Sequence, residues 1–568
     1  MKNIPLYEDR HIANLRQMLY ESCELYKDNV AYLSKDESKK YQEIKYGKVL
    51  EDVKALGVAL IGLGLKDKRV AIIGENRYEW SISYLAVICG VGVVVPLDKM
   101  LPEQEIKNCL KRADVSAVIY SDKLDDKIEE IKKEFGNIEY FITMKKDENV
   151  LSVEQLVQRG KELIESGDRK YEDAEIDENV MASLLFTSGT TSESKAVMLS
   201  HKNIANNIEN MTKLVEFFSE DRMLSILPIH HTYECTCGFL MPIYKGSSVA
   251  YCDGLKYIAS DMKEAKPTVV LAVPLIVESM YDKIWQNINK QGKTNLVKTM
   301  IKVTNALDKL GIHLKKKVFK EIHENFGGRI RLLIAGAAAI NPEVSKGLRD
   351  LGLFAMQGYG LTETSPIAAV NRPVDYKDAA VGLPLPGSEV KIDNPNDEGV
   401  GEIIVKGDSV MLGYYQNEEA TNEVLKDGWF YTGDLGYIDE DGFVYVSGRK
   451  KNVIITKNGK NIYPEELEGL LNESKYIKES MVYEKAKGDD KKIVAAIVVD
   501  QEVLNEESGG LSHGSLSPEE IKDLIWGEVK KVNDKLVLEK HIREIDIRDN
   551  EFEKTTTMKI KRYIEKKD

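Results

Sequence analysis

The chain has 568 residues, of which 43% are hydrophobic and 30% are charged, and its formal net charge is −14 at pH 7. This length leaves room for about two to four structural units with large cores, and the composition is that of a soluble globular protein. A negative charge of this size argues against a general nucleic-acid binder, although a local site can still bind a small anion.

The six cysteines are sparse and irregularly spaced, and Cys235 and Cys237 lack the spacing and the second pair of a structural zinc site. We interpret them as reduced thiols of a cytoplasmic protein. Residues 1–16 show no apolar core of a signal peptide, and the most apolar stretch, 84–97, is too short to span a bilayer. We therefore expect no transmembrane segment, while the sequence leaves a peripheral membrane contact open.

Strands and amphipathic helices alternate in the first half of the chain. We expect strands at 69–74, 91–97 and 115–120, with helices at 78–90 and 104–113 between them. Further buried strands are expected at 181–186, 223–227, 268–273 and 330–335. Strands that are separated by helices imply a parallel, doubly wound sheet.

The texture of the sequence changes after about residue 378, where short strands, glycines and turns predict a small antiparallel or β-barrel-like unit. Beyond the charged turn at 448–452 an α+β pattern begins, and the glycine-rich interval 506–518 is predicted to be a loop within it. We therefore predict an α/β fold with a large N-terminal domain at 1–448, which includes the β-rich subdomain 378–448, and a small C-terminal α+β domain at 449–568.

The segment 187–195, Thr-Ser-Gly-Thr-Thr-Ser-Glu-Ser-Lys, follows a predicted buried strand and is rich in hydroxyl groups. Hydroxyls and free backbone N–H groups can surround phosphate oxygens, and Lys195 adds a mobile positive charge. The segment lacks the Walker A pattern. A turn of this composition is by itself more often a plain loop than a phosphate site.

Seven short motifs follow one another along the chain, each of them weak when taken alone. They are Thr187–Lys195, Leu227–His231, Gly336–Ala338, Gln357–Thr364, Tyr431–Asp434, Gly448–Arg449 and Lys559. In this order they are specific: from about residue 46 to residue 562 the chain resembles the acyl-adenylating superfamily of acyl-CoA synthetases, nonribosomal adenylation domains and firefly luciferase.

The resemblance makes segment 187–195 the cradle for the β- and γ-phosphates of ATP. The residues concerned are Thr187, Ser188, Gly189, Thr190, Thr191 and Lys195. Ser192, Ser194 and Ala196 stand where the family usually has Gly, Pro and Gly. If position 192 requires positive φ, a serine there costs about 1 kcal/mol.

The segment Gln357–Thr364 contributes Gln357, Gly358, Tyr359 and Gly360 to the expected ATP site. Tyr359, between two glycines, is expected to stack on adenine, and Thr362 to donate a hydrogen bond to the α-phosphate. Glu363 is a hard oxygen ligand suited to Mg²⁺, and in the family it helps to bind the metal together with the residue that matches Thr187. From the residues alone, a glycine-rich turn with a capping box is an equal alternative.

Three further positions complete the expected nucleotide site. Gly336, Ala337 and Ala338 resemble the turn by which backbone approaches adenine, although close packing of the preceding strand would also explain them. Asp434 is expected to accept hydrogen bonds from both ribose hydroxyls, as the matching residue does in the family. Arg449 can reach ribose or phosphate oxygens.

The same resemblance assigns the residue that contacts the acyl group and the lysine that supplies positive charge during catalysis. His231 is expected to line the acyl pocket near the carboxylate, with the adjacent His230 as the alternative. Lys559 is expected to neutralise charge on the carboxylate and the α-phosphate, and Lys554 is the first lysine of the same motif. Glu553 and Met558 replace the Pro and Gly of the family's motif.

The family's small domain rotates between two reaction steps. The resemblance places the pivot of this rotation at Lys451, and it places Gly459 beside the pantetheine arm of the thiol substrate. A carboxylate first attacks the α-phosphate of ATP and expels pyrophosphate, and a thiol then attacks the acyl-adenylate. The repulsion between the two anionic reactants must be offset by Mg²⁺, Lys559 and the loop donors.

The segments 74–80, 227–234, 411–415 and 427–434 resemble the long-chain fatty acyl-CoA synthetase branch, and no Asp follows a Phe near 231–236 as in amino-acid-activating relatives. We expect a fatty acid or another hydrophobic carboxylic acid as substrate, with ATP, Mg²⁺ and coenzyme A, and no fused carrier domain. A ligase that loads a separate acyl carrier protein is the alternative, and a non-catalytic nucleotide- or acyl-binding relative is a third hypothesis.

Overall fold

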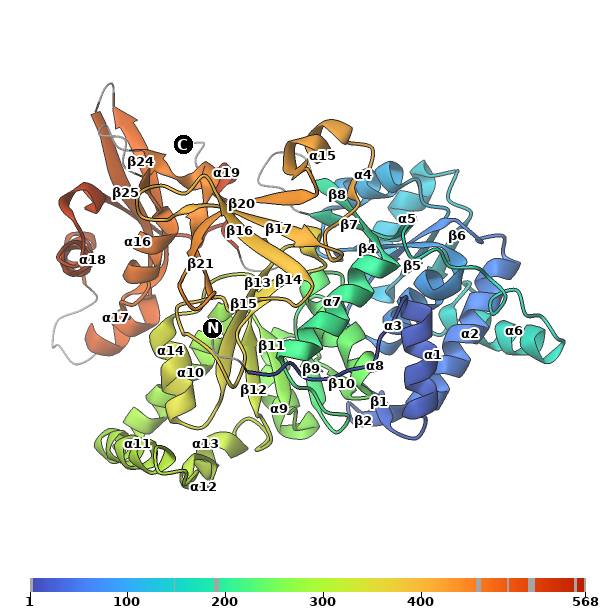
Figure 1. Cartoon of the computed structure of the whole chain (residues 1–568), viewed down its shortest axis with the longest axis horizontal. Coiled ribbons are helices and arrows are strands. Elements are labelled where there is room, and N and C mark those ends of the chain that lie inside the picture. The colour runs from blue at the N-terminus through green and yellow to red at the C-terminus, as the bar shows by residue number, and fades with distance from the viewer. Residues whose placement is uncertain are drawn as a thin grey trace.

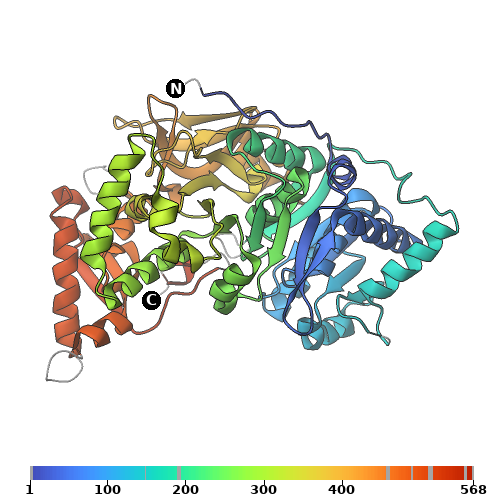
Figure 2. The same ribbon diagram turned by 90° about the horizontal axis from the view of Figure 1, so that it is seen from below.

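The computed structural model describes residues 4–147, 149–187, 194–455, 461–487, 490–508, 516–555 and 559–565. A large N-terminal part and a smaller C-terminal part are distinct in Figure 1. Figure 2 shows them from below, with the first helices and the C-terminal helices at opposite ends of the molecule. This arrangement confirms the predicted α/β class with a large first and a small last domain.

A seven-stranded sheet has the order β18–β8–β7–β4–β3–β5–β6. Its strands are β3 (Arg69–Ile73), β4 (Val93–Leu97), β5 (Ala117–Tyr120), β6 (Tyr140–Thr143), β7 (Met181–Thr187), β8 (Lys195–Ser200) and β18 (Gly413–Tyr414). The strands from β7 to β6 run parallel, as predicted, and have helices on both faces. Strand β8 was not predicted; it returns antiparallel to β7, so that Lys195 lies opposite Thr187.

A nine-stranded sheet has the order β15–β14–β13–β12–β11–β9–β10–β1–β2. Its strands are β1 (Val30–Lys35), β2 (Tyr41–Lys45), β9 (Arg222–Ser225), β10 (Ser248–Tyr251), β11 (Val269–Ala272), β12 (Leu332–Ala335), β13 (Ala355–Gly360), β14 (Ile367–Val370) and β15 (Leu383–Pro384). Strands β13, β12, β11, β9, β10 and β1 run parallel. Their carboxyl ends meet at one edge, which is where ligands bind in open α/β sheets.

Helices cover both sheets. In the large domain they are α1 (Leu15–Leu25), α2 (Tyr46–Gly62), α3 (Tyr78–Ala86), α4 (Glu103–Ala113), α5 (Asp125–Glu134), α6 (Val153–Glu165), α7 (His201–Leu214), α8 (Met241–Lys245), α9 (Ile258–Ala265), α10 (Pro274–Lys290), α11 (Thr294–Asp308), α12 (Lys315–Val318), α13 (Lys320–Glu324), α14 (Pro342–Asp350) and α15 (Glu418–Val424). The largest core joins α1, α2 and α7 to both sheets. Helices α9, α10 and α14 pack on the opposite face of the nine-stranded sheet. None of the helices in the described residues is both long and apolar enough to cross a membrane.

The β-rich unit is a five-stranded antiparallel sheet in the order β16–β17–β20–β19, with β21 paired to β20. The strands are β16 (Ser388–Asp393), β17 (Gly401–Gly407), β19 (Leu425–Lys426), β20 (Trp429–Ile438) and β21 (Val444–Arg449). Asp434 and Arg449 are register partners on β20 and β21. This pairing places two of the expected site residues side by side.

The C-terminal part is a separate α+β unit with its own core. It contains β22 (Ile454–Ile455), β23 (Asn461–Ile462), α16 (Pro464–Leu471), β24 (Ile477–Lys487), β25 (Asp490–Val499), α17 (Gln501–Ser508), α18 (Pro518–Asn533), β26 (Glu544–Arg548) and α19 (Arg562–Glu565). The predicted loop at 506–518 begins later than expected, because α17 continues to Ser508; residues 509–515 lie outside the described residues. Leu504 of α17 is buried in the core and anchors this helix.

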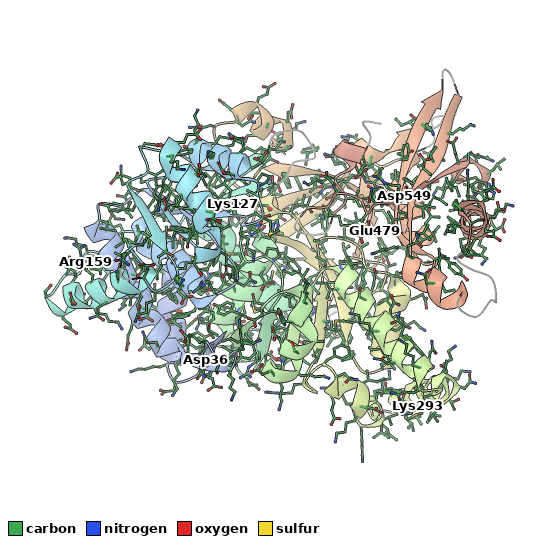
Figure 3. The ribbon with its side chains drawn as sticks, turned by 180° about the vertical axis from the view of Figure 1, so that it is seen from behind. Asp36, Lys127, Arg159, Lys293, Glu479 and Asp549 are labelled. Carbon is green, nitrogen blue, oxygen red and sulfur yellow. The ribbon has the colours of Figure 1, made fainter. Side chains whose placement is uncertain are left out.

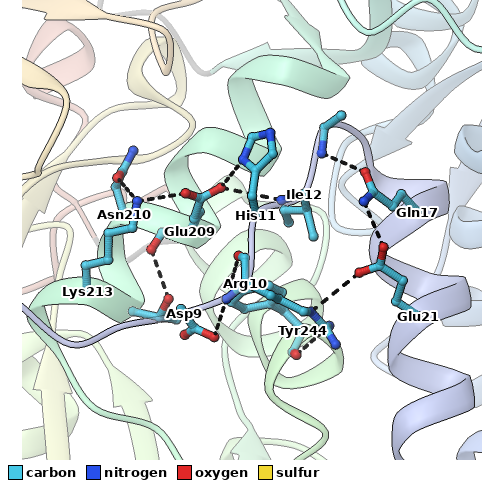
Figure 4. Close-up of polar contacts among 12 residues, drawn as sticks. Asp9, Arg10, His11, Ile12, Gln17, Glu21, Glu209, Asn210, Lys213 and Tyr244 are labelled. Carbon is cyan, nitrogen blue, oxygen red and sulfur yellow. Dashed lines mark hydrogen bonds and ion pairs between the residues drawn. The ribbon is translucent and has the colours of Figure 1, made fainter.

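Residues 4–13 precede α1 and run across α7 and α8 as a strap (Figure 4). The side chain of His11 contacts Glu209 of α7, with 2.8 Å between Nδ1 and Oε2. Lys245 at the end of α8 forms an ion pair of 2.7 Å with Asp9. The buried Arg372 donates hydrogen bonds to the carbonyl oxygens of Ile4 and Pro5. The strap therefore links α7, α8 and Arg372 through its polar contacts.

Candidate active site

The buried carboxylate of Asp434 joins the nine-stranded sheet to the β-rich unit. Its Oδ2 accepts a hydrogen bond of 2.7 Å from the hydroxyl of Tyr359 at the end of β13. Its Oδ1 lies 2.7 Å from Nε of Arg449 on β21. A carboxylate has about four lone-pair positions, so each oxygen keeps an acceptor position that a ribose hydroxyl could use.

Glu363 and Lys195 are linked through Tyr414, a residue that the sequence did not single out for the site. The hydroxyl of Tyr414 donates to Oε1 of Glu363 at 2.8 Å. Nζ of Lys195 lies 4.5 Å from the centre of the Tyr414 ring, in a cation–π contact. Because β18 pairs with β8, Tyr414 is delivered to the phosphate segment; the only signal in the sequence was its place in the 411–415 motif.

The donor set at Glu363 fits Mg²⁺ that arrives with a nucleotide. No group of three or more His, Cys, Asp or Glu suited to a metal occurs among the described residues. Mg²⁺ is usually held by one or two carboxylates together with phosphate oxygens and water, and Glu363 can supply one such carboxylate. Thr187, the second expected ligand, is half-buried, and its hydroxyl donates to the carbonyl of Lys195 at 3.2 Å.

Lys559 of the C-terminal domain lies within electrostatic range of Arg449, Asp434 and Glu363. It is exposed to solvent, yet both domains approach it closely enough to desolvate its charge. This desolvation, together with the nearby Arg449, lowers the pKa of Lys559 to about 8, although the two carboxylates act in the opposite direction. Lys554, the other lysine of the motif, forms an ion pair with Glu479 of its own domain.

The rings of His230 and His231 lie with their centres 4.3 Å apart and their planes tilted by 37°, and Asp98 lies near both. Nε2 of the buried His230 lies 3.7 Å from Oδ2 of Asp98. His231 is half-buried, and Lys559 contributes to its electrostatic surroundings. Burial lowers the pKa of each imidazole to about 3, so both are neutral near pH 7. His231 is thus the histidine on the side of Lys559.

The glycine-rich motifs shape the edge of the nine-stranded sheet. A Cβ atom on Gly336 would come within 2.7 Å of the Tyr233 ring. Ala337 has φ of +72°, a left-handed conformation that is uncommon for alanine. On β13, a Cβ on Gly360 would come within 1.8 Å of the carbonyl oxygen of Pro366. Gly336 is therefore required by the close Tyr233 ring and Gly360 by the close backbone of Pro366, and Ala338 follows Ala337 in the same turn.

Gln357 lies in the motif but its side chain has structural partners. Its amide nitrogen donates to the carbonyls of Asp378 and Ala380 at 2.9 and 3.1 Å, and its Oε1 accepts from the backbone of Ile340 at 3.1 Å. The side chain is buried. Any contact of Gln357 with a nucleotide would therefore have to come from its backbone.

A small apolar cavity of about 30 Å³ lies behind this edge. It is lined by Met211, Val215, Phe217, Tyr233, Cys237, Met241, Leu271, Ile334, Gly358, Ile367 and Val370. The hydroxyl of Tyr233 donates to the carbonyl of Ile334 at 2.9 Å, so its polar group is already satisfied. A cavity of this size admits about one water-sized group, so an acyl chain could enter only if the apolar side chains around it moved apart. Helices α7 and α8, which the N-terminal strap holds, contribute Met211 and Met241.

Glu234 lies beside this cavity on the buried segment Tyr233–Leu240. Its Oε1 accepts a hydrogen bond of 2.5 Å from the hydroxyl of Ser225. Burial raises the pKa of Glu234 to about 8, so the group is largely neutral at pH 7. The cavity wall therefore carries no negative charge from this residue that would repel a carboxylate.

Several expected site residues lie outside the described residues. They are Ser188, Gly189, Thr190 and Thr191 of the phosphate segment, and Gly459 of the expected pantetheine loop. Lys451, the expected pivot, lies at the junction of the domains, where burial and the positive charges of Arg449 and Lys195 lower its pKa to about 8.

The chain belongs to the AMP-binding enzyme family, as the motifs predicted. It matches that family over residues 19–415 and the AMP-binding enzyme C-terminal domain over residues 451–566.

Three of the relatives illustrate the named activities. The long-chain-fatty-acid–CoA ligase FadD15 of Mycobacterium tuberculosis is 28% identical over 92% of this chain and 90% of its own length. The long-chain-fatty-acid–CoA ligase 5 of Rattus norvegicus is 31% identical over 78% and 69%. A chloroplastic long-chain-fatty-acid–acyl-carrier-protein ligase of Arabidopsis thaliana is 26% identical over 90% and 79%.

Solved structures share the fold. The anthranilate CoA ligase AuaEII in complex with anthranoyl-AMP has a TM-score of 0.78 at 20% identity, over 99% of this chain and 98% of that one. ATP-bound MatB from Rhodopseudomonas palustris has a TM-score of 0.72 at 24% identity, over 97% and 98%.

The electrostatic setting of Lys559 predicts an unusually reactive amine. We expect its acylation by a small reagent, followed by mass spectrometry of the peptide, to rise through a midpoint near pH 8, because its pKa is lowered to about 8. Arg449→Gln removes the positive charge that lowers this pKa, so its midpoint should lie at higher pH. A midpoint near the ordinary value of 10.5 in the unmodified protein would contradict the placement of Lys559.

Proposed function

We propose that the chain joins a fatty acid to coenzyme A with ATP, by way of an acyl-adenylate. The observation that carries this proposal is that Lys559, from the C-terminal domain, lies within electrostatic range of Asp434 and Glu363 of the large domain, which contact Arg449 and Tyr414. The apolar side chains around the small cavity behind Gly358 support the proposal, because they could part to take up a hydrocarbon chain.

In the first step we assign Lys559 to the two anions that must approach each other. Its positive charge would offset the repulsion between the fatty-acid carboxylate and the α-phosphate, and would stabilise the charge that builds up in the transition state. The hydroxyl of Thr362 accepts a hydrogen bond from Thr232 at 3.1 Å, which leaves its own proton for a phosphate oxygen. When bound, Mg²⁺ would neutralise phosphate charge, with Glu363 and Thr187 as its protein ligands.

Nucleotide recognition is assigned to residues that already form one unit. The pair of Asp434 and Arg449 would bind the ribose, and Tyr359, held by Asp434, would present its ring to adenine. The backbone at Gly336–Ala338 and Gln357–Gly360 would form the walls of the base site. Lys195 and segment 187–191 would bind the terminal phosphates; the cation–π contact with Tyr414 positions Lys195 toward Glu363.

For the second step we propose that the C-terminal domain, residues 449–568, turns about Lys451. This turn would withdraw Lys559 and bring the loop of Gly459 to the pantetheine arm of coenzyme A. The neutral His231, beside Lys559, would contact the carboxylate end of the acyl group in both steps. The boundary near residue 449 is supported by the separate core of the C-terminal unit.

We assign the acyl substrate from the apolar lining of the cavity, and the thiol acceptor from the names of the relatives. A cavity with apolar walls favours a fatty acid over a short polar acid. Two of the named relatives are CoA ligases, while the Arabidopsis relative is named as a ligase for an acyl carrier protein. Coenzyme A is therefore the acceptor we propose, and a separate carrier protein is the second candidate. The six unpaired cysteines agree with a cytoplasmic location.

The direct test is pyrophosphate release from Mg-ATP with fatty acids of increasing length, with and without coenzyme A. We expect fatty-acid-dependent release in both cases, with multiple turnovers only when coenzyme A is present. A third reaction set with a phosphopantetheinylated carrier protein separates the two acceptors. Absence of pyrophosphate release with every acid would support a non-catalytic binding protein instead.

Replacing Lys559 should separate the two half-reactions. Lys559→Ala should lower acyl-adenylate formation by at least about a hundredfold, the size of effect seen when one transition-state donor is removed. The same variant should still convert a preformed acyl-adenylate and coenzyme A to the thioester. Lys561→Ala, two residues away, is the matched control and should retain both reactions; equal loss of both in Lys559→Ala would argue against the domain turn.

Narrowing the cavity should shorten the preferred acyl chain. Cys237 lines the cavity, and Cys237→Phe would fill it and crowd the surrounding apolar side chains. We expect kcat/KM for long acids to fall while that for short acids is kept, as measured by pyrophosphate release across the series. Cys237→Ser, which keeps the side-chain volume, should leave the chain-length profile in place. An unchanged profile in Cys237→Phe would show that the acyl chain binds elsewhere.

A further inference from the structure

The segment 283–320 has a charge opposite to that of the whole chain. It contains ten lysines, no arginine and a single acidic residue, Asp308, in a protein with a net charge of −14. The segment comprises the end of α10, all of α11 and α12, and the first residue of α13. We call residues 283–320 the lysine-rich projection.

This projection lies at the periphery of the large domain. Helices α11, α12 and α13 extend away from the nine-stranded sheet in Figure 1, and Lys293 stands at the outer edge in Figure 3. Ile288, Val297, Thr304 and Phe319 are buried and attach the projection to the domain. The projection is therefore packed against the domain, and the side chains that it leaves exposed are held in place by this packing.

Apolar side chains are exposed on the same projection. Leu310 is 75% exposed, the largest value for a large apolar side chain in the described part of the chain. Ile312, across Gly311 from Leu310, is 46% exposed. Leu296 and Val303 of α11 are 57% and 53% exposed, and their spacing of seven residues places them on one side of the helix. Together they form an apolar stripe that ends in the tip Leu310–Ile312.

Most of the lysines here have no acidic partner. Lys293, Lys315 and Lys320 pair with Glu321, Asp308 and Glu324 at 3.8, 2.8 and 3.4 Å. The other lysines form no ion pair with any residue that the structure describes; they include Lys290, Lys298, Lys302, Lys309, Lys316 and Lys317, all exposed. Positive charge of this density is available to an external anionic surface.

We propose that the lysine-rich projection docks the protein on an anionic lipid bilayer. Lysines near such a surface bind its head groups, and apolar side chains at the tip can enter the boundary between head groups and acyl chains. An acidic protein would satisfy the lysines but would not by itself explain an apolar tip that is exposed between them. The proposal stands on the chemistry of this surface and goes beyond the proposed ligase activity.

The test is flotation of the whole chain with vesicles of phosphatidylcholine alone or of phosphatidylcholine with phosphatidylglycerol. We expect binding to the anionic vesicles that weakens as salt is added, since screening shortens the range of the attraction. Lys316→Glu with Lys317→Glu should lower the partition coefficient at least about 25-fold, because each lysine contributes about fivefold. Leu310→Ser with Ile312→Ser should also weaken binding.

The matched control is Lys111→Glu with Lys145→Glu, which changes two exposed lysines elsewhere in the large domain. This variant should bind like the unmodified protein. Equal binding of the unmodified protein to both vesicle types, or to neither, would overturn the proposal. The proposal would also be overturned if the protein bound polyglutamate as tightly as vesicles and if Leu310→Ser with Ile312→Ser had no effect. That result would assign the surface to an acidic protein. Pyrophosphate release with a short, water-soluble acid reports folding and activity separately from docking.

Discussion

Two positive charges, those of Lys559 and Arg449, meet at the junction of the domains, and the carboxylates of Asp434 and Glu363 offset their repulsion. Asp434 and Glu363 come from the large domain, Lys559 from the C-terminal domain, and Arg449 from the boundary between them, at the end of β21. The charge balance is therefore complete only in this arrangement of the two domains. A bound triphosphate would add negative charge at the same place and would stabilise the arrangement further.

The remainder of the fold holds these charged groups in position. Strands β13, β20 and β21 set the positions of Tyr359, Asp434 and Arg449. The pairing of β18 with β8 carries Tyr414 to Glu363 and Lys195. On the apolar side, the N-terminal strap secures α7 and α8, whose side chains line the cavity. The charged and apolar halves of the site thus meet at β13, where Tyr359 contacts Asp434 and the neighbouring Gly358 lines the cavity.

The sequence predicted what depends on local pattern. Alternating strands and helices gave the parallel centre of the first sheet, and the ordered motifs identified the family. Contacts between distant segments had no such signal: Tyr414 meets Lys195 only because β18 joins the edge of β8. Gln357 belongs to a nucleotide motif, yet its side chain is bound within the fold. The lysine-rich projection was not predicted, because the net charge is a sum over the whole chain and does not show a local excess of lysine.

The most direct measurement of the central claim is mass spectrometry of the small molecules bound to the protein after incubation with Mg-ATP and a long-chain fatty acid, without coenzyme A. A charged junction built around Lys559, next to an apolar cavity, predicts a fatty acyl-AMP on the unmodified protein. The same molecule should disappear as fatty acyl-CoA forms when coenzyme A is added. Intact ATP with unmodified fatty acid, or ADP as the only product, would contradict this account.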